Sequence, residues 1–168
     1  MSTIATSTSV MTWELTWARP LLLIHAALGF GLLAICVHVL WFAWRGTGKN
    51  AAWRARRYAA IAWPMYIAAF VTGALIYPAY MVTVRKPWLE ANRPAMVGWF
   101  EIKEHWAALG LVLAWGVWRY FRKSEKDDVL TPDRTFSRGV AFLALLATIC
   151  VLINVVFGAW IVMVRSVS

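Results

Sequence analysis

Four long apolar stretches determine what this 168-residue chain can fold into. They cover residues 20–44, 58–82, 98–121 and 139–164, and a helix needs roughly 20 residues to cross a bilayer. Hydrophobic residues make up 61% of the chain, well above the share in a soluble domain. Because these stretches make up most of the chain and leave only short segments between them, we predict a single all-α membrane domain, residues 1–168, built as a four-transmembrane-helix bundle.

The basic residues predict how the bundle is oriented. Five Lys and Arg lie in 45–57 and six in 119–138, which makes 11 of the 17 in the chain. Since connections rich in Lys and Arg stay cytoplasmic, both are expected inside, with both termini outside a bacterial-type cytoplasmic (inner) membrane. The formal charge of +9 then reflects this orientation and anionic lipid, and we expect no nucleic-acid partner.

Residues 1–16 form the segment ahead of the first apolar stretch. They are rich in Ser and Thr and contain no basic residue. This composition argues against a cleaved signal peptide and predicts a short mobile tail.

The chain repeats itself weakly. His25-Ala-Ala-Leu-Gly-Phe-Gly-Leu-Leu-Ala resembles His105-Trp-Ala-Ala-Leu-Gly-Leu-Val-Leu-Ala, with one residue inserted after the second histidine. A tandem duplication of a helix pair would relate the halves by a pseudo-two-fold axis along the membrane normal. His25 and His105 would then be equivalent positions that face a common axis. The alternative is chance similarity between apolar helices.

Depth in the membrane supports the same pairing. Both helices run inward from the outer face, and at about 1.5 Å per residue His25 and His105 differ in depth by only roughly 3 Å. Two imidazoles at one level are what a b-type haem takes as axial ligands, and small neighbours such as Gly29 and Gly110 make room for the ring. We predict one haem b with His25 and His105 on its iron. The alternative is that each imidazole bonds a backbone carbonyl or a neighbouring side chain.

His38 is the third histidine. It lies about 20 Å deeper than His25 and is turned by roughly 220° around the helix. A methionine such as Met65 would complete a His/Met site, which makes His38 a candidate ligand of a second haem. The chain has only three histidines, so we favour a His38 that bonds locally or faces the cytoplasmic headgroups.

The third stretch opens on charged residues. An ionisable group costs on the order of 2 to 3 kcal/mol at the bilayer centre, so Glu101, Lys103 and Glu104 need compensation. Glu101 shares a helical face with His105, and Glu104 is turned roughly 100° away. We predict that both glutamates form a proton relay in which Glu101 matters more. The alternative is that a snorkelling Lys103, water and one Glu–Lys pair compensate the charges.

Four helices, histidines at matched depth and a polar cluster beside one of them resemble the small b-type cytochrome subunits of respiratory enzymes. The resemblance covers the whole chain in architecture, but many such cytochromes have four histidines for two haems. It implies an electron-transport subunit of an oxidoreductase complex, with one haem b near the outer face. A quinone would exchange electrons there, with Glu101 or Glu104 as proton partner. Expected partners are membrane lipids and other membrane or redox subunits, or a second copy.

Two other classes of function stay open. The first is a non-redox subunit that scaffolds or assembles a membrane complex, which would show no haem absorption. The second is a small proton-coupled transporter, in which the charged residues beside His105 line a cavity open to the outside.

Overall fold

The protein is almost entirely helical. The structure, a computed structural model, describes residues 3–45, 49–126 and 134–164, and no strand occurs among them. The prediction of an all-α fold with four long helices is confirmed. The long helices are α1 (Thr3–Trp44), α2 (Lys49–Tyr80), α4 (Pro94–Lys126) and α5 (Arg134–Val164), and η1 (Met81–Leu89) and α3 (Glu90–Asn92) connect α2 to α4.

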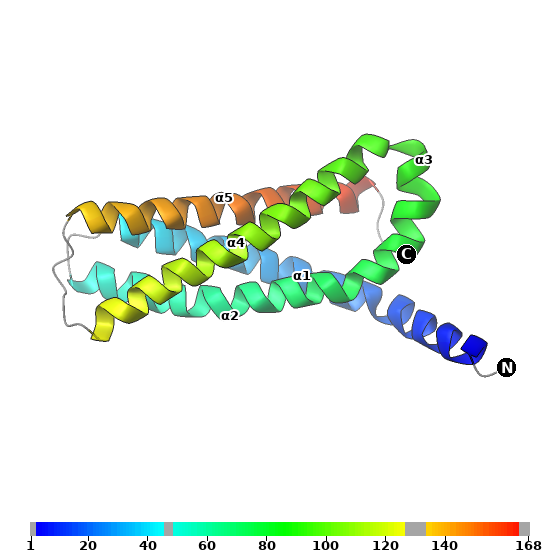
Figure 1. The fold of residues 1–168 in the computed structure, drawn as a ribbon, viewed down its shortest axis with the longest axis horizontal. Coiled ribbons are helices and arrows are strands. Elements are labelled where there is room, and N and C mark those ends of the chain that lie inside the picture. The colour runs from blue at the N-terminus through cyan, green and yellow to red at the C-terminus, as the bar shows by residue number, and fades with distance from the viewer. Residues whose placement is uncertain (1–2, 46–48, 127–133, 165–168) are drawn as a thin grey trace.

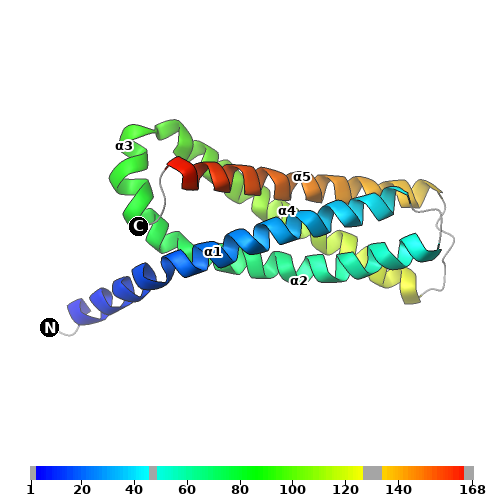
Figure 2. The ribbon, with the colours of Figure 1, turned by 180° about the vertical axis from the view of Figure 1, so that it is seen from behind.

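The four long helices pack side by side in one bundle (Figures 1 and 2). Both α1 and α4 pack against α2 and against α5. Within the described residues, no Cα atom of α1 lies within 8 Å of a Cα atom of α4. The helices α1 and α4 are therefore diagonal to each other across the bundle, as are α2 and α5.

Three helical segments are long and apolar enough to cross a membrane. They are Thr16–Trp44, Asn50–Asn92 and Arg138–Val164. The helix α4 is not among them, because Lys103 and Glu104 at one end and Arg119 and Arg122 at the other leave a short uncharged run. Large apolar side chains also cover the outside of the bundle, as in Val112, which is 63% exposed. Such a surface suits lipid rather than water.

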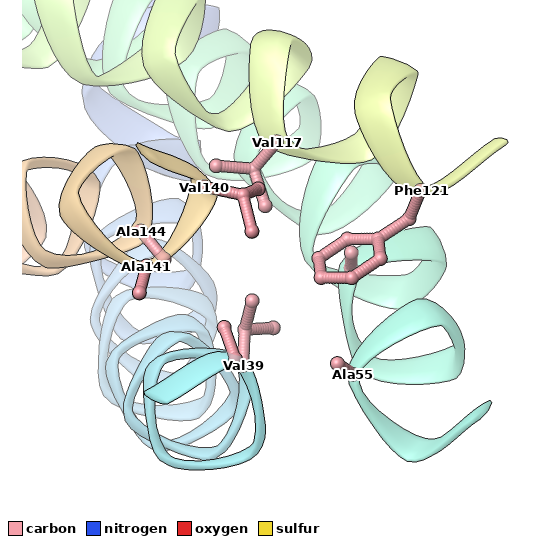
Figure 3. Packing of buried hydrophobic residues seen from close by; sticks show 9 residues of the cluster. Val39, Ala55, Val117, Phe121, Val140, Ala141 and Ala144 are labelled. Carbon is pink, nitrogen blue, oxygen red and sulfur yellow. The ribbon is translucent and has the colours of Figure 1, made fainter. Parts of the chain in front are cut away.

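Small side chains let the helices approach closely inside the bundle. Figure 3 shows one such cluster, where Val39 of α1, Ala55 of α2, Val117 of α4 and Val140 of α5 meet. We call this the basic end, because the arginines of 45–57 and 119–122 lie there. Alanine occupies many core positions, and its small side chain lets the helix backbones lie close together.

The opposite end, which we call the η1 end, is closed by an unexpected continuation of the second helix. We predicted that this helix ends at residue 82, but η1 and α3 carry it on to Asn92 and across the bundle to α4 (Figure 1). Pro78 and Pro87 lack the N–H that an α-helix needs, which accounts for the looser π-helical hydrogen bonding around them. The chain turns at Arg93, and Pro94 begins α4.

The first helix also begins earlier than predicted. Its first residue is Thr3, so the expected tail, residues 1–16, is helical over its described part. Met1 and Ser2 lie outside the described residues. The blue segment in Figure 1 projects past the η1 end of the bundle.

Candidate functional site

His25 is half-buried and faces α2. Its Nδ1–H donates to the carbonyl oxygen of Ala69 at 2.8 Å, and Nδ1 lies 3.3 Å from Oγ1 of Thr72. The ring lies against Gly73, where an added Cβ would be 3.0 Å from Cε1. Gly73 thus leaves the space that the imidazole fills, and Nε2 carries the lone pair of this tautomer.

The other two histidines bond within their own helices. Nδ1 of His105 donates to the carbonyl oxygen of Glu101 at 2.7 Å, and Nδ1 of His38 donates to that of Ala34 at 2.7 Å. Both side chains are exposed. All three imidazoles therefore bond a backbone carbonyl, as in the alternative interpretation of the sequence.

The two predicted cofactor-binding glycines lie against protein side chains. A Cβ on Gly29 would be 3.6 Å from Val155 of α5. A Cβ on Gly110 would clash with the hydroxyl of Tyr66 and lie 2.8 Å from Cβ of Cys150. The Tyr66 hydroxyl donates to the carbonyl oxygen of Ala107 at 3.0 Å. Gly110 therefore lets α2 and α5 approach α4.

As the structure places them, His25 and His105 do not fit as the two axial ligands of one haem. The ring of His25 faces α2, and that of His105 faces outward, so the two imidazoles do not point toward each other. Met65, the predicted partner of His38, lies against Gly31, two turns or roughly 10 Å before His38. Among the described residues, no three His, Cys, Asp or Glu side chains group as a metal site. The haem b stays a prediction, and we derive no chemistry through it.

Charged residues do meet at the η1 end. Nη2 of Arg85 donates to Oε1 of Glu101 at 2.6 Å, and its Nε donates to Oε1 of Glu90 at 3.3 Å. The Arg85 side chain is 16% exposed, while half of each glutamate side chain is exposed. Arg85 therefore ties η1 to α4, and the carboxylate of Glu101 is already engaged.

Tyr80 is the unusual residue of this end. It is 5% exposed, and its hydroxyl has no hydrogen-bond partner among the described residues. Its ring stacks on Phe100 with centroids 4.4 Å apart, and Nζ of Lys103 lies 4.8 Å from the centroid of the Phe100 ring. The charges of Arg85 and Glu104 both act on the Tyr80 hydroxyl. An orphaned donor beside charged groups is a place where a polar ligand is expected.

Lys103 and Glu104 belong to the same group of side chains. Nζ of Lys103 lies against the Phe100 ring that stacks on Tyr80, and Glu104 follows Lys103 along α4. We call Tyr80, Arg85, Glu101, Lys103 and Glu104 the η1-end cluster.

The sequence prediction missed the ion pair between Arg85 and Glu101 and the burial of the Tyr80 hydroxyl. If the second helix stops at residue 82, Arg85 lies in a loop, and its charge bears only on the predicted orientation in the membrane. The signal that was available is the helical spacing of Tyr77, Tyr80 and Val84, which continues past that point.

Comparisons of the chain with models of protein families, with curated proteins and with solved structures find no match. The fold defines a helical bundle with candidate membrane-spanning helices, and the site adds a polar cluster at one end of it.

Proposed function

We propose that the protein is a four-span membrane subunit with both termini outside. The close packing of α4 against α2 and α5 supports a fourth crossing, because α4 could not stay out of a membrane that its neighbours cross. The diagonal positions of α1 and α4 are those that a duplication axis along the bundle would give. Because segments rich in Lys and Arg stay on the cytoplasmic side, the basic end would face the cytoplasm and the η1 end would face the outside.

We propose further that this subunit serves electron transport by binding a quinone headgroup at the η1-end cluster. The unpartnered hydroxyl of Tyr80 is the observation that carries the proposal, because a phenolic O–H can donate to a quinone carbonyl. Phe100 and Tyr77 add flat aromatic surfaces beside it. The lipid-facing surface of the helices gives an isoprenoid chain a place to lie.

The two predicted proton-relay residues take different roles in this proposal. Glu101 positions Arg85, since its carboxylate is held in the ion pair. We assign to Glu104, one turn after Phe100 on α4, the role of accepting a proton from a bound quinol, because the carboxylate of Glu101 is engaged by Arg85. This reverses the order that the helical-face argument predicts, and the electron acceptor would be a redox centre of a partner subunit.

To test the proposal, the protein is purified in mild detergent, bound quinone is extracted with organic solvent, and the quinone in the extract is quantified. We expect about one quinone per chain for the wild type, because each chain has one η1-end cluster. Tyr80→Phe should lose it, and Tyr58→Phe at the basic end should retain it. A quinone content no higher than that of empty micelles would contradict the proposal. If the same sample also showed no haem absorption, the interpretation as a non-redox scaffold subunit would be favoured.

A proton-coupled transporter is the second candidate. It is favoured by the four charged side chains of the η1-end cluster, Arg85, Glu101, Lys103 and Glu104, which gather at one end of the bundle. Uptake by reconstituted vesicles that depends on a pH gradient, without quinone or chromophore, would support it.

A further inference from the structure

A row of stacked side chains crosses the α1–α2 interface at the basic end. His38 of α1 stacks on Tyr58 of α2 with ring centroids 5.0 Å apart, and Phe42 stacks on Tyr58 at 5.8 Å. The guanidinium carbon of Arg54 lies 5.6 Å from the centroid of the Phe42 ring. The pairs 38/42 and 54/58 are each one helical turn apart, so these side chains share one face of the α1–α2 pair.

Arginine–tryptophan pairs flank this row. The guanidinium carbon of Arg45 lies 3.8 Å from the ring centroid of Trp41, and that of Arg57 lies 4.6 Å from Trp53. In the pair that contains Arg57, the aromatic face holds the guanidinium group in place while its N–H edges can meet another acceptor. Residues 45–57 contain five basic residues and no acidic one, so the local field favours an anion.

We propose that Arg54 and Arg57 bind the phosphate headgroup of an anionic phospholipid. Guanidinium groups match phosphate oxygens in pairs, which a zwitterionic headgroup uses less well because it carries its own cation. Val37 and Ile61 are exposed apolar side chains on the same two helices, farther from the basic end, where acyl chains would lie. The chemistry therefore fits a lipid rather than a free phosphate ion, and the site is independent of the proposed quinone site.

The test measures thermal unfolding of the full chain in detergent while cardiolipin, phosphatidylcholine or inorganic phosphate is added at equal phosphate concentration. We expect cardiolipin alone to raise Tm. Replacing Arg54 and Arg57 by Gln should weaken apparent cardiolipin binding by about fivefold per arginine, since each basic residue near an anionic surface contributes ~1 kcal/mol. The matched control is the pair Arg119→Gln and Arg122→Gln, which removes two exposed arginines of α4 near the same end.

Several outcomes would overturn the proposal. They are equal stabilisation by phosphatidylcholine or by inorganic phosphate, full cardiolipin binding by R54Q/R57Q, and an equal loss in R119Q/R122Q. If R54Q/R57Q does not fold, R54K/R57K takes its place. It keeps the charge but loses paired N–H donation. We therefore expect R54K/R57K to bind cardiolipin measurably, but more weakly than the wild type does. Undiminished binding by R54K/R57K would refute the role of paired donation.

Discussion

The guanidinium of Arg85 lies 2.6 Å from the carboxylate of Glu101, which joins η1 to α4 at the end of the bundle. This ion pair connects a segment that the sequence leaves outside the second span to the charged start of the third. Tyr80, which is buried and stacks on Phe100, directly precedes η1.

A double-mutant cycle on this ion pair should give a measurable coupling energy. Because half of the Glu101 side chain is exposed, we expect only roughly 0.5–1 kcal/mol between Arg85→Gln and Glu101→Gln. The measurement is denaturant unfolding in detergent, repeated at high salt, which should reduce the coupling. Additive single effects at low salt would show that the pair does not hold η1 in place.

The predicted orientation can be tested by thiol labelling of intact cells. Cys36 and Cys150 are free and buried, so the background carries Ala at both positions. A cysteine at Ala95, near the η1 end, should react with a membrane-impermeant maleimide. A cysteine at Lys123, at the basic end, should react only after lysis. The opposite labelling pattern would invert the topology.

Gly110 should tolerate no side chain, because Tyr66 and Cys150 occupy the space of a Cβ. We expect Gly110→Ala to destabilise the bundle by roughly 1–3 kcal/mol through overpacking. Gly116→Ala is the control on the same helix, since a Cβ there meets nothing within 4 Å. It should be neutral or gain up to about 1 kcal/mol from the lower entropy of the unfolded chain. Equal thermal shifts in the two variants would contradict the packing at Gly110.

The haem prediction has a spectroscopic test. If His25 and His105 bind one haem b, His25→Ala and His105→Ala should each lose the low-spin reduced-minus-oxidised signal, and His38→Ala should keep it. An unchanged low-spin signal in either of the first two variants would refute the pairing. Loss of all haem in His38→Ala would move the site to the basic end.

Hydrophobic length was enough to predict the number and type of the long helices. Segments of more than 20 mostly apolar residues predict helices in a membrane, and the third segment is helical as well although charged residues stand near both of its ends. The end of the second helix was not predictable in the same way, because Arg85, Lys86 and Pro87 have the composition of a loop. Packing of Val84 and Leu89, both fully buried, keeps this segment helical.

The site was harder to predict because one sequence carries no information on which helices are neighbours. Residue counting gives the depth of His25 and His105, but the diagonal placement of α1 and α4 follows from contacts among all four helices. The direction of His25 depends on the gap at Gly73 of another helix, and the role of Glu101 depends on Arg85.

The most direct test of the central claim is a titration of purified protein with a soluble short-chain quinone, in which binding is measured as quenching of tryptophan fluorescence. We predict saturable binding by the wild type and by Tyr58→Phe, and at least about fivefold weaker binding by Tyr80→Phe, since one lost hydrogen bond to a buried group costs ~1 kcal/mol or more. Equal Kd values for wild type and Tyr80→Phe, or quenching that never saturates, would contradict a quinone site at the η1 end.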